Sequence, residues 1–198
     1  MYIARILYPV KVLGPGNRIG IWFDGCEHHC NNCSNPELWD FNDKYKVNKQ
    51  QIIRMIRQIT DDYHVDGFTL TGGDPFYQPD ALQELLPELA KISDDILVYT
   101  GYLLEDIQDR YKELLKYIAV LIDGPYLDER NDGCILRGSD NQRIIINKNK
   151  FKALYNDYLA TRKNEIQNFS LRDGVISVGI HQRGFEKELH KAILLEGE

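Results

Sequence analysis

The amino-acid sequence predicts an α/β fold: a partial, open βα barrel of about six parallel strands with an added N-terminal edge strand. Three observations lead to this prediction. Short runs rich in Val, Ile, Thr and aromatic residues alternate with longer segments of helical hydrophobic spacing. Strands that alternate with helices of this length form βαβ units and a parallel sheet. About six such units are too few for a closed eight-stranded barrel.

Each predicted strand is short, apolar and followed by a turn that contains Gly or Asp. Val, Ile, Thr and aromatic side chains pack well on a pleated surface, and buried strands of parallel sheets are rich in them. The segment Met1–Val12 is predicted to add the edge strand. The other strands are expected at Ile19–Asp24, Gly67–Thr71, Ile96–Thr100, Ile118–Asp123, Arg143–Ile146 and Val175–Ile180.

Helices are predicted between these strands. Ile52, Ile53, Ile56 and Ile59 lie at helical spacing and form one apolar face. Asp80 has the residue type of an N-cap for the second helix. Residues 147–171 contain many Lys, Asn and Tyr residues and are predicted to form a solvated helix plus a linker. The expected helices are Lys49–Tyr63, Ala81–Ile92, Leu104–Lys116, Phe151–Leu159 and Phe185–Leu194.

Composition limits the functions that the chain can have. With 198 residues, no repeat and no linker rich in Pro, Gly and Ser, it is expected to form a single domain, residues 1–198. Its 24 basic and 30 acidic residues give a net charge of −6, which argues against non-specific binding of nucleic acid. No stretch has the roughly 20 apolar residues of a membrane helix, and the N-terminus lacks a signal-peptide cleavage site. We therefore expect a cytoplasmic protein with no nucleic acid or membrane partner.

Three of the four cysteines, Cys26, Cys30 and Cys33, follow the first parallel strand with the spacing C-x3-C-x2-C. Thiolates are the usual ligands of iron–sulfur clusters. Three of them in one loop can bind three irons of a [4Fe-4S] cluster and leave the fourth iron open for a substrate. Asn32 and Ser34 place short polar groups beside such a cluster. A metal centre is therefore predicted in this loop.

Other uses of the cysteines remain open at this point. The three cysteines with His28 or His29 could bind a structural zinc, although both histidines are more typical of loop residues. Cys134 stands alone about a hundred residues later and is expected to be unligated, but a cluster with four thiolates is an alternative.

A second functional loop, Gly72-Gly73-Asp74-Pro75, follows the second parallel strand. Paired glycines allow the backbone to approach a ligand closely, and a carboxylate can accept hydrogen bonds from an ammonium group. Taken alone, this is also an ordinary strand-to-helix turn. Thr100 and Asp123 end the next two strands, at the same edge of the predicted sheet, where loops of α/β proteins bind ligands.

The cysteine spacing resembles the motif of the radical S-adenosylmethionine enzymes. Many members have an aromatic residue before the third cysteine, where this chain has Asn32. The run from Gly25 to Trp39 instead resembles the proteins that activate anaerobic (class III) ribonucleotide reductases. Gly72-Gly73-Asp74, Arg137–Arg143 and Val178-Gly179-Ile180 also resemble these activating proteins, so the likeness extends from Gly25 to about Phe185.

This resemblance implies a function and a set of ligands. Cys26, Cys30 and Cys33 would bind the cluster, and Asp74 would contact the amino group of S-adenosylmethionine. Further cofactor contacts would come from Asn32, Ser34, Gly72, Gly73, Thr100 and Asp123, with no catalytic side chain beyond these ligands. The arginines of 137–143 would shape a loop, or meet the cofactor carboxylate or a partner protein.

The implied reaction is reductive cleavage of S-adenosylmethionine, followed by removal of a hydrogen atom from a glycine of the reductase. An electron donor such as flavodoxin or ferredoxin would reduce the cluster. Three alternatives remain: an activator of another glycyl radical enzyme of the formate-lyase type, a radical enzyme that modifies a small molecule or peptide, and a zinc or iron–sulfur module for regulation or electron transfer. A simple electron carrier would not need Gly72-Gly73-Asp74 beside its cluster.

Overall fold

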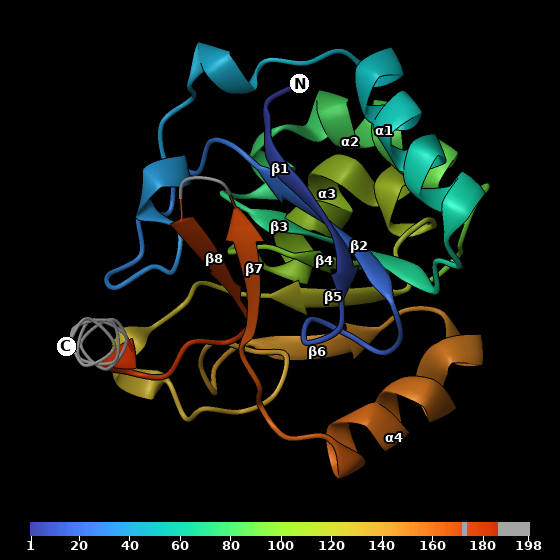
Figure 1. Ribbon diagram of the computed structural model, residues 1–198. Coiled ribbons are helices and arrows are strands. Elements are labelled where there is room, and N and C mark those ends of the chain that lie inside the picture. Colours follow the sequence, from blue (N-terminus) through green and yellow to red (C-terminus); the bar gives the residue numbers. More distant parts are fainter. Residues whose placement is uncertain (172–173, 186–198) are drawn as a thin grey trace, which may run out of the picture.

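The computed structural model describes residues 1–171 and 174–185 and contains a six-stranded sheet with helices packed against it (Figure 1). The strands follow one another across the sheet in the same order as in the sequence. They are β1 (Ile3–Val10), β2 (Arg18–Phe23), β3 (Gly67–Gly72), β4 (Ile96–Tyr99), β5 (Val120–Asp123) and β6 (Arg143–Ile146). An additional two-stranded sheet pairs β7 (Gln167–Leu171) with β8 (Gly174–Val178).

The four central strands, β2 to β5, are parallel, and both edge strands are antiparallel to their neighbours. The predicted N-terminal edge strand is therefore confirmed as β1. The prediction of about six parallel strands is wrong in two places, because β6 is antiparallel and the predicted strand Val175–Ile180 lies mainly in β8 of the separate sheet. Parallel strands need a long crossover connection. Between β5 and β6 the chain forms only a single 3-10 turn, Asp128–Arg130, and returns in the opposite direction.

The central strands are apolar because both of their faces are covered. All six residues of β2 are buried, as expected for the interior of a mostly parallel sheet. Within the described part of the chain, β1 and β6 do not pair with each other, so the sheet is open. The curvature of a partial barrel stays a prediction.

Three helices cover one face of the sheet and share its largest apolar core. A capping box between Asn48 and Gln51 starts the first of them. The second helix begins at Pro79, earlier than predicted, because proline fits the first helical turn. Asp80 therefore lies inside that turn and is not the N-cap, which is Gln78. These helices are α1 (Lys49–Asp62), α2 (Pro79–Leu89) and α3 (Leu104–Leu115).

The opposite face is covered by residues 147–171, for which the sequence predicts a solvated helix and a linker. The helix exists as α4 (Lys152–Thr161), but it is not simply solvated: Tyr155 is fully buried and Tyr158 nearly so. Both tyrosines pack against residues of β4 and β5. The expected linker contains β7 instead. The predicted helix Phe185–Leu194 lies beyond the described residues except for Phe185.

A buried ion pair lies at the amino ends of the parallel strands. Arg18, the first residue of β2, is fully buried, and its Nη1 donates to Asp95 Oδ2 at 2.7 Å. Its Nε donates to Thr69 Oγ1 at 2.8 Å, and the Tyr155 hydroxyl donates to Asp95 Oδ1 at 2.7 Å. These contacts connect β2, β3 and the start of β4 with α4. None of the described helices is long and apolar enough to cross a membrane.

Candidate iron–sulfur and cofactor site

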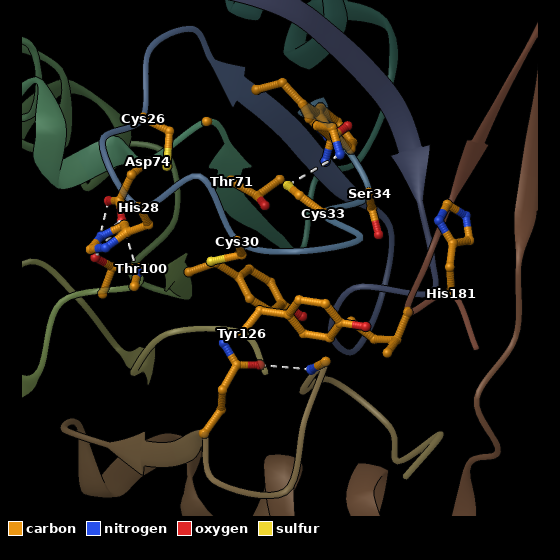
Figure 2. A pocket seen from close by; sticks show the side chains of 18 of the residues that line it. Cys26, His28, Cys30, Cys33, Ser34, Thr71, Asp74, Thr100, Tyr126 and His181 are labelled. Atoms are coloured by element: carbon orange, nitrogen blue, oxygen red, sulfur yellow. Dashed lines mark hydrogen bonds and ion pairs between the residues drawn. The ribbon is translucent and has the colours of Figure 1, made fainter. Parts of the chain in front are cut away.

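A cavity lies at the carboxyl ends of the parallel strands, where the loops that follow β2, β3, β4 and β5 meet (Figure 2). This is the edge at which ligands bind in open α/β sheets. The hairpin formed by β7 and β8 provides another wall through residues 177–181. The cavity is lined by Cys26, His28, Cys30, Cys33, Ser34, Gly73, Asp74, Tyr99, Thr100, Tyr126 and Gln142, among others.

Backbone hydrogen bonds hold the start of the loop that carries Cys26, Cys30 and Cys33 (the cysteine loop) in place. The N–H of Gly25 donates to Leu38 O at 2.9 Å, and the N–H of Cys26 donates to Trp39 O at 2.8 Å. Gly25 has φ +95°, and a Cβ there would lie 2.3 Å from the Phe41 ring. A glycine is therefore required at the point where β2 turns into the loop.

The three cysteines predicted as metal ligands all line this one cavity. Burial raises the pKa of the Cys26 thiol to about 11 and also raises the pKa of Cys30. The backbone N–H of His28 lowers the pKa of Cys26, and that of Tyr126 lowers the pKa of Cys30, but both effects are smaller than that of burial. The N–H of Asn35 donates to Cys33 Sγ at 3.4 Å. Such donors stabilise thiolates bound to a cluster. The thiols must lose their protons when they bind metal.

The donor set fits a cluster with three protein ligands. Thiolates of a cubane bind different irons, whereas the ligands of one zinc ion converge on a single point. Among the described residues, no three His, Cys, Asp or Glu side chains are grouped as they would be around one ion. Both histidines of the loop have other partners: His28 contacts Asp74, and His29 stacks on Trp39 at 4.7 Å between ring centroids.

Cys134 lies outside the cavity lining and has local partners. Its Sγ donates to Asp132 Oδ2 at 3.0 Å, and Arg137 forms an ion pair with the same carboxylate at 3.1 Å. Hydrogen bonding to Asp132 raises the pKa of the Cys134 thiol. Cys134 therefore lies apart from the three cysteines that line the cavity, and its being unligated stays a prediction.

Asp74 is almost fully buried and receives four donors. The N–H groups of Phe76 and Gly101 donate to Oδ1 and Oδ2, each at 2.8 Å. The Thr100 hydroxyl lies 3.0 Å from both oxygens, and His28 Nε2 lies 3.1 Å from Oδ2. The hydrogen bond to Asp74 raises the pKa of His28 above its ordinary value. A buried carboxylate is thus held rigidly at the cavity wall.

The other predicted contact residues lie at different distances from this centre. Ser34, Gly73 and Thr100 line the cavity, whereas Asn32 lines only an adjoining outer cavity. Gly72 is not part of the lining. It has φ +110°, and a Cβ there would lie 2.4 Å from the Phe23 carbonyl oxygen, so it is needed for close backbone packing beside the loop.

Asp123 is fully buried but outside the cavity lining, because other groups bind it. The Arg143 guanidinium forms an ion pair with it, and the N–H of Leu104 donates to Oδ2 at 2.7 Å. Arg143 also contacts Glu105 at 2.7 Å. Arg137 and Arg143 therefore pair with acidic side chains of this chain, while Gly138 and Gln142 of that run reach the cavity.

Sequence reasoning missed several residues of the site. It treated His28 as a loop residue, and no local signal could show that its ring meets Asp74. The cavity wall at the β7–β8 hairpin was missed as well, although the motif Val178-Gly179-Ile180 lies in it. Tyr99 contributes a buried hydroxyl that has no hydrogen-bond partner among the described residues.

The outer cavity adjoins the first one and shares Cys33, Ser34 and Tyr126 with it. Its volume is about 690 Å³, compared with about 180 Å³ for the inner cavity. It lies between the cysteine loop and β8. The inner cavity is therefore the smaller of two adjoining cavities.

Comparison with known proteins supports a [4Fe-4S] cluster in this chain. The family described as "4Fe-4S single cluster domain" matches residues 12–145, which include the cysteine loop and the central strands. The fold and site thus define an α/β iron–sulfur protein with one cluster, and this match favours the cluster over the zinc alternative.

The curated relatives make the assignment more specific. The chain is 36% identical over 147 residues to the anaerobic ribonucleoside-triphosphate reductase-activating protein of Haemophilus influenzae, covering 69% of this chain and 93% of that protein. For the proteins of the same name from Enterobacteria phage T4 and Vibrio cholerae, identity is 35% and 34%, with 71% and 69% of this chain and 92% and 93% of the relatives covered. The chain belongs to the family of anaerobic ribonucleoside-triphosphate reductase-activating proteins.

Proposed function

We propose that this chain is a radical S-adenosylmethionine enzyme that generates a glycyl radical on an anaerobic ribonucleoside-triphosphate reductase. The observation that carries the proposal is the meeting of three cysteines and the buried Asp74 carboxylate in one cavity. Membership of the activating-protein family supports the same function.

Cys26, Cys30 and Cys33 would hold the [4Fe-4S] cluster. When bound and reduced, the cluster supplies the electron that cleaves S-adenosylmethionine to methionine and a 5′-deoxyadenosyl radical, which takes a hydrogen atom from a glycine of the reductase. The chain itself provides binding and orientation, as proteins do for cofactors with demanding chemistry. An external donor such as flavodoxin or ferredoxin would reduce the cluster in the cytoplasm.

The cofactor contacts in this proposal follow the cavity. Asp74 would accept from the ammonium group of S-adenosylmethionine, and Gly73, Thr100 and Ser34 would line its site. Gly72 and Asp123 would act indirectly. Gly72 permits the close packing of the loop that carries Asp74, and Asp123 fixes the start of α3.

The reductase segment would reach the cluster through the outer cavity. This cavity leads past Asn32 to Cys33 and Ser34, and β8 forms its other wall. We infer that residues 1–198 act as one radical S-adenosylmethionine domain and that the open sheet is a partial barrel whose open side is closed by the hairpin. The smaller inner cavity would shield the radical, while the larger outer cavity would admit a glycine-bearing chain.

The test is a reconstitution under anaerobic conditions. The protein is loaded with iron and sulfide, reduced and mixed with S-adenosylmethionine and the reductase from the same organism. A glycyl radical signal in electron paramagnetic resonance, together with 5′-deoxyadenosine, is expected.

Failure can be assigned to a specific part of the proposal. Formation of 5′-deoxyadenosine without a glycyl radical on the reductase, while another glycyl radical enzyme or a peptide is modified, would contradict the partner but not the radical chemistry. A protein that binds zinc or a cluster but does not cleave S-adenosylmethionine would contradict both.

A further inference from the structure

The His28 side chain of the cysteine loop lies against Asp74 at the cavity wall, as Figure 2 shows. His28 lies two residues after Cys26, and its Nε2 lies 3.1 Å from Asp74 Oδ2. Asp74 follows β3 and belongs to a different loop. This contact is therefore a direct side-chain connection between the predicted cluster loop and the carboxylate proposed to bind the cofactor.

The His28 ring packs against the loop that follows β4. A Cβ at Gly101 would lie 2.5 Å from the ring atom Cδ2, so a residue without a side chain is required there. Tyr102 meets the ring edge-on, with 4.6 Å between ring centroids. The Tyr102 hydroxyl in turn donates to Glu27, the neighbour of His28. The ring is thus fixed on two sides besides its hydrogen bond.

The other donors to Asp74 come from the loops that follow β3 and β4. Phe76 and Gly101 contribute backbone N–H groups, and Thr100 contributes a hydroxyl. His28 is the only donor among the four that belongs to the cysteine loop. A side chain that is held by its neighbours and donates to a charged acceptor restricts the orientation of that acceptor.

We propose that His28 is a positioning residue that orients the Asp74 carboxylate for the ammonium group of S-adenosylmethionine and couples that carboxylate to the cysteine loop. The proposal rests on the proposed function, because it assumes that Asp74 meets this cofactor. It assigns His28 neither metal binding nor proton transfer. The Nε2–H donor of His28, and not the bulk of its ring, supports cofactor binding.

Two substitutions separate the donor from the ring. His28→Gln keeps an amide N–H at about the reach of Nε2 but loses the ring. His28→Phe keeps a ring against Tyr102 and Gly101 but has no donor. His29→Gln, in the same loop but outside the cavity lining, is the matched control.

The measurement is a titration of each reduced, reconstituted protein with S-adenosylmethionine, followed by the change in the electron paramagnetic resonance spectrum of the cluster. Iron content is measured in parallel. We expect near-normal iron content in all variants, an apparent Kd about tenfold higher for His28→Phe, and values near wild type for His28→Gln and His29→Gln.

Each contrary result has a distinct meaning. If His28→Phe binds as tightly as wild type, or more tightly, the donor does not support cofactor binding and the proposal is wrong. If His28→Gln fails and His28→Phe succeeds, packing alone is responsible, which also overturns it. Loss of iron in both variants would make His28 a residue that only stabilises the loop. A wild-type spectrum that does not respond to S-adenosylmethionine would overturn the proposed function and this inference with it.

Discussion

The two ends of the parallel strands both contain buried polar groups, but they use them differently. At the amino ends, Arg18, Asp95 and Tyr155 satisfy one another within a closed network. At the carboxyl ends, the three cysteines of the cysteine loop line a cavity. Buried polar groups are costly unless they are paired. The polar network at the amino ends therefore stabilises the fold, whereas the thiols at the carboxyl ends remain available to bind a ligand.

Asp74 shows that the division is not absolute. It lies at the carboxyl end, yet it has four protein donors, like a residue of the opposite network. A carboxylate that must bind a ligand in a fixed orientation needs such support before the ligand arrives. The comparison thus predicts that substitutions at one end change folding stability, and that those at the other change cofactor binding.

The largest effect is expected for the three loop cysteines. Replacing Cys26, Cys30 or Cys33 with Ala should abolish cleavage of S-adenosylmethionine, because each thiolate would bind a different iron. The assay is anaerobic formation of 5′-deoxyadenosine with iron content measured in parallel. Cys134→Ala should retain both, and loss of the cluster in that variant would contradict the three-ligand set.

A large effect on stability is expected at the opposite end. Arg18→Met leaves the buried Asp95 carboxylate without its partner, which should cost about 3–5 kcal/mol of unfolding free energy. Urea denaturation of the metal-free protein measures this loss. The exposed pair between Lys150 and Asp94 provides the control, since Lys150→Ala should cost less than about 1 kcal/mol. Equal losses of unfolding free energy in the two variants would contradict the conclusion that the buried network at the amino ends stabilises the fold.

Asp74→Ala should weaken S-adenosylmethionine binding while iron content is retained. Loss of a hydrogen bond to a charged group costs about 1.5–3 kcal/mol, or about ten- to hundredfold in affinity. An anaerobic binding titration measures the change. Unchanged affinity would remove Asp74 from the cofactor site and leave it a structural residue.

The smallest effect concerns pH. Hydrogen bonds from Arg143 lower the pKa of Glu105 to about 2. A carboxyl group with a lowered folded-state pKa stabilises the protein above its unfolded pKa of about 4.3, and this contribution is lost as the pH falls toward 2. Wild type should therefore melt slightly above Glu105→Gln at pH 7, and the difference should shrink between about pH 4.5 and 2. A difference that grows as the pH falls would contradict this assignment.

Local sequence patterns predicted the central strands and most helices, because hydrophobic periodicity reports directly on burial. They could not predict the direction of β6, which depends on the missing crossover helix before it. They also failed for residues 147–171, where polar composition concealed the buried ring of Tyr155. The Tyr155 hydroxyl donates to Asp95, which is far away in the sequence. No local periodic pattern therefore indicates that Tyr155 is buried.

The candidate site shows the same limit. The spacing of Cys26, Cys30 and Cys33 predicted a common loop, since ligands close in sequence are constrained by the chain itself. The contact between His28 and Asp74 joins residues 46 positions apart, and the pairing of Asp123 with Arg143 joins residues 20 apart. Such pairs depend on how loops from different strands meet, which only the folded structure specifies.

In the proposed site, three thiolates at the carboxyl ends of the strands would hold a [4Fe-4S] cluster and leave one iron for S-adenosylmethionine. Mössbauer spectroscopy of protein reconstituted with ⁵⁷Fe tests it most directly, because it distinguishes irons in different coordination. The account predicts one iron that differs from the other three and whose signal alone shifts when S-adenosylmethionine is added. Four irons that do not respond to S-adenosylmethionine would contradict it.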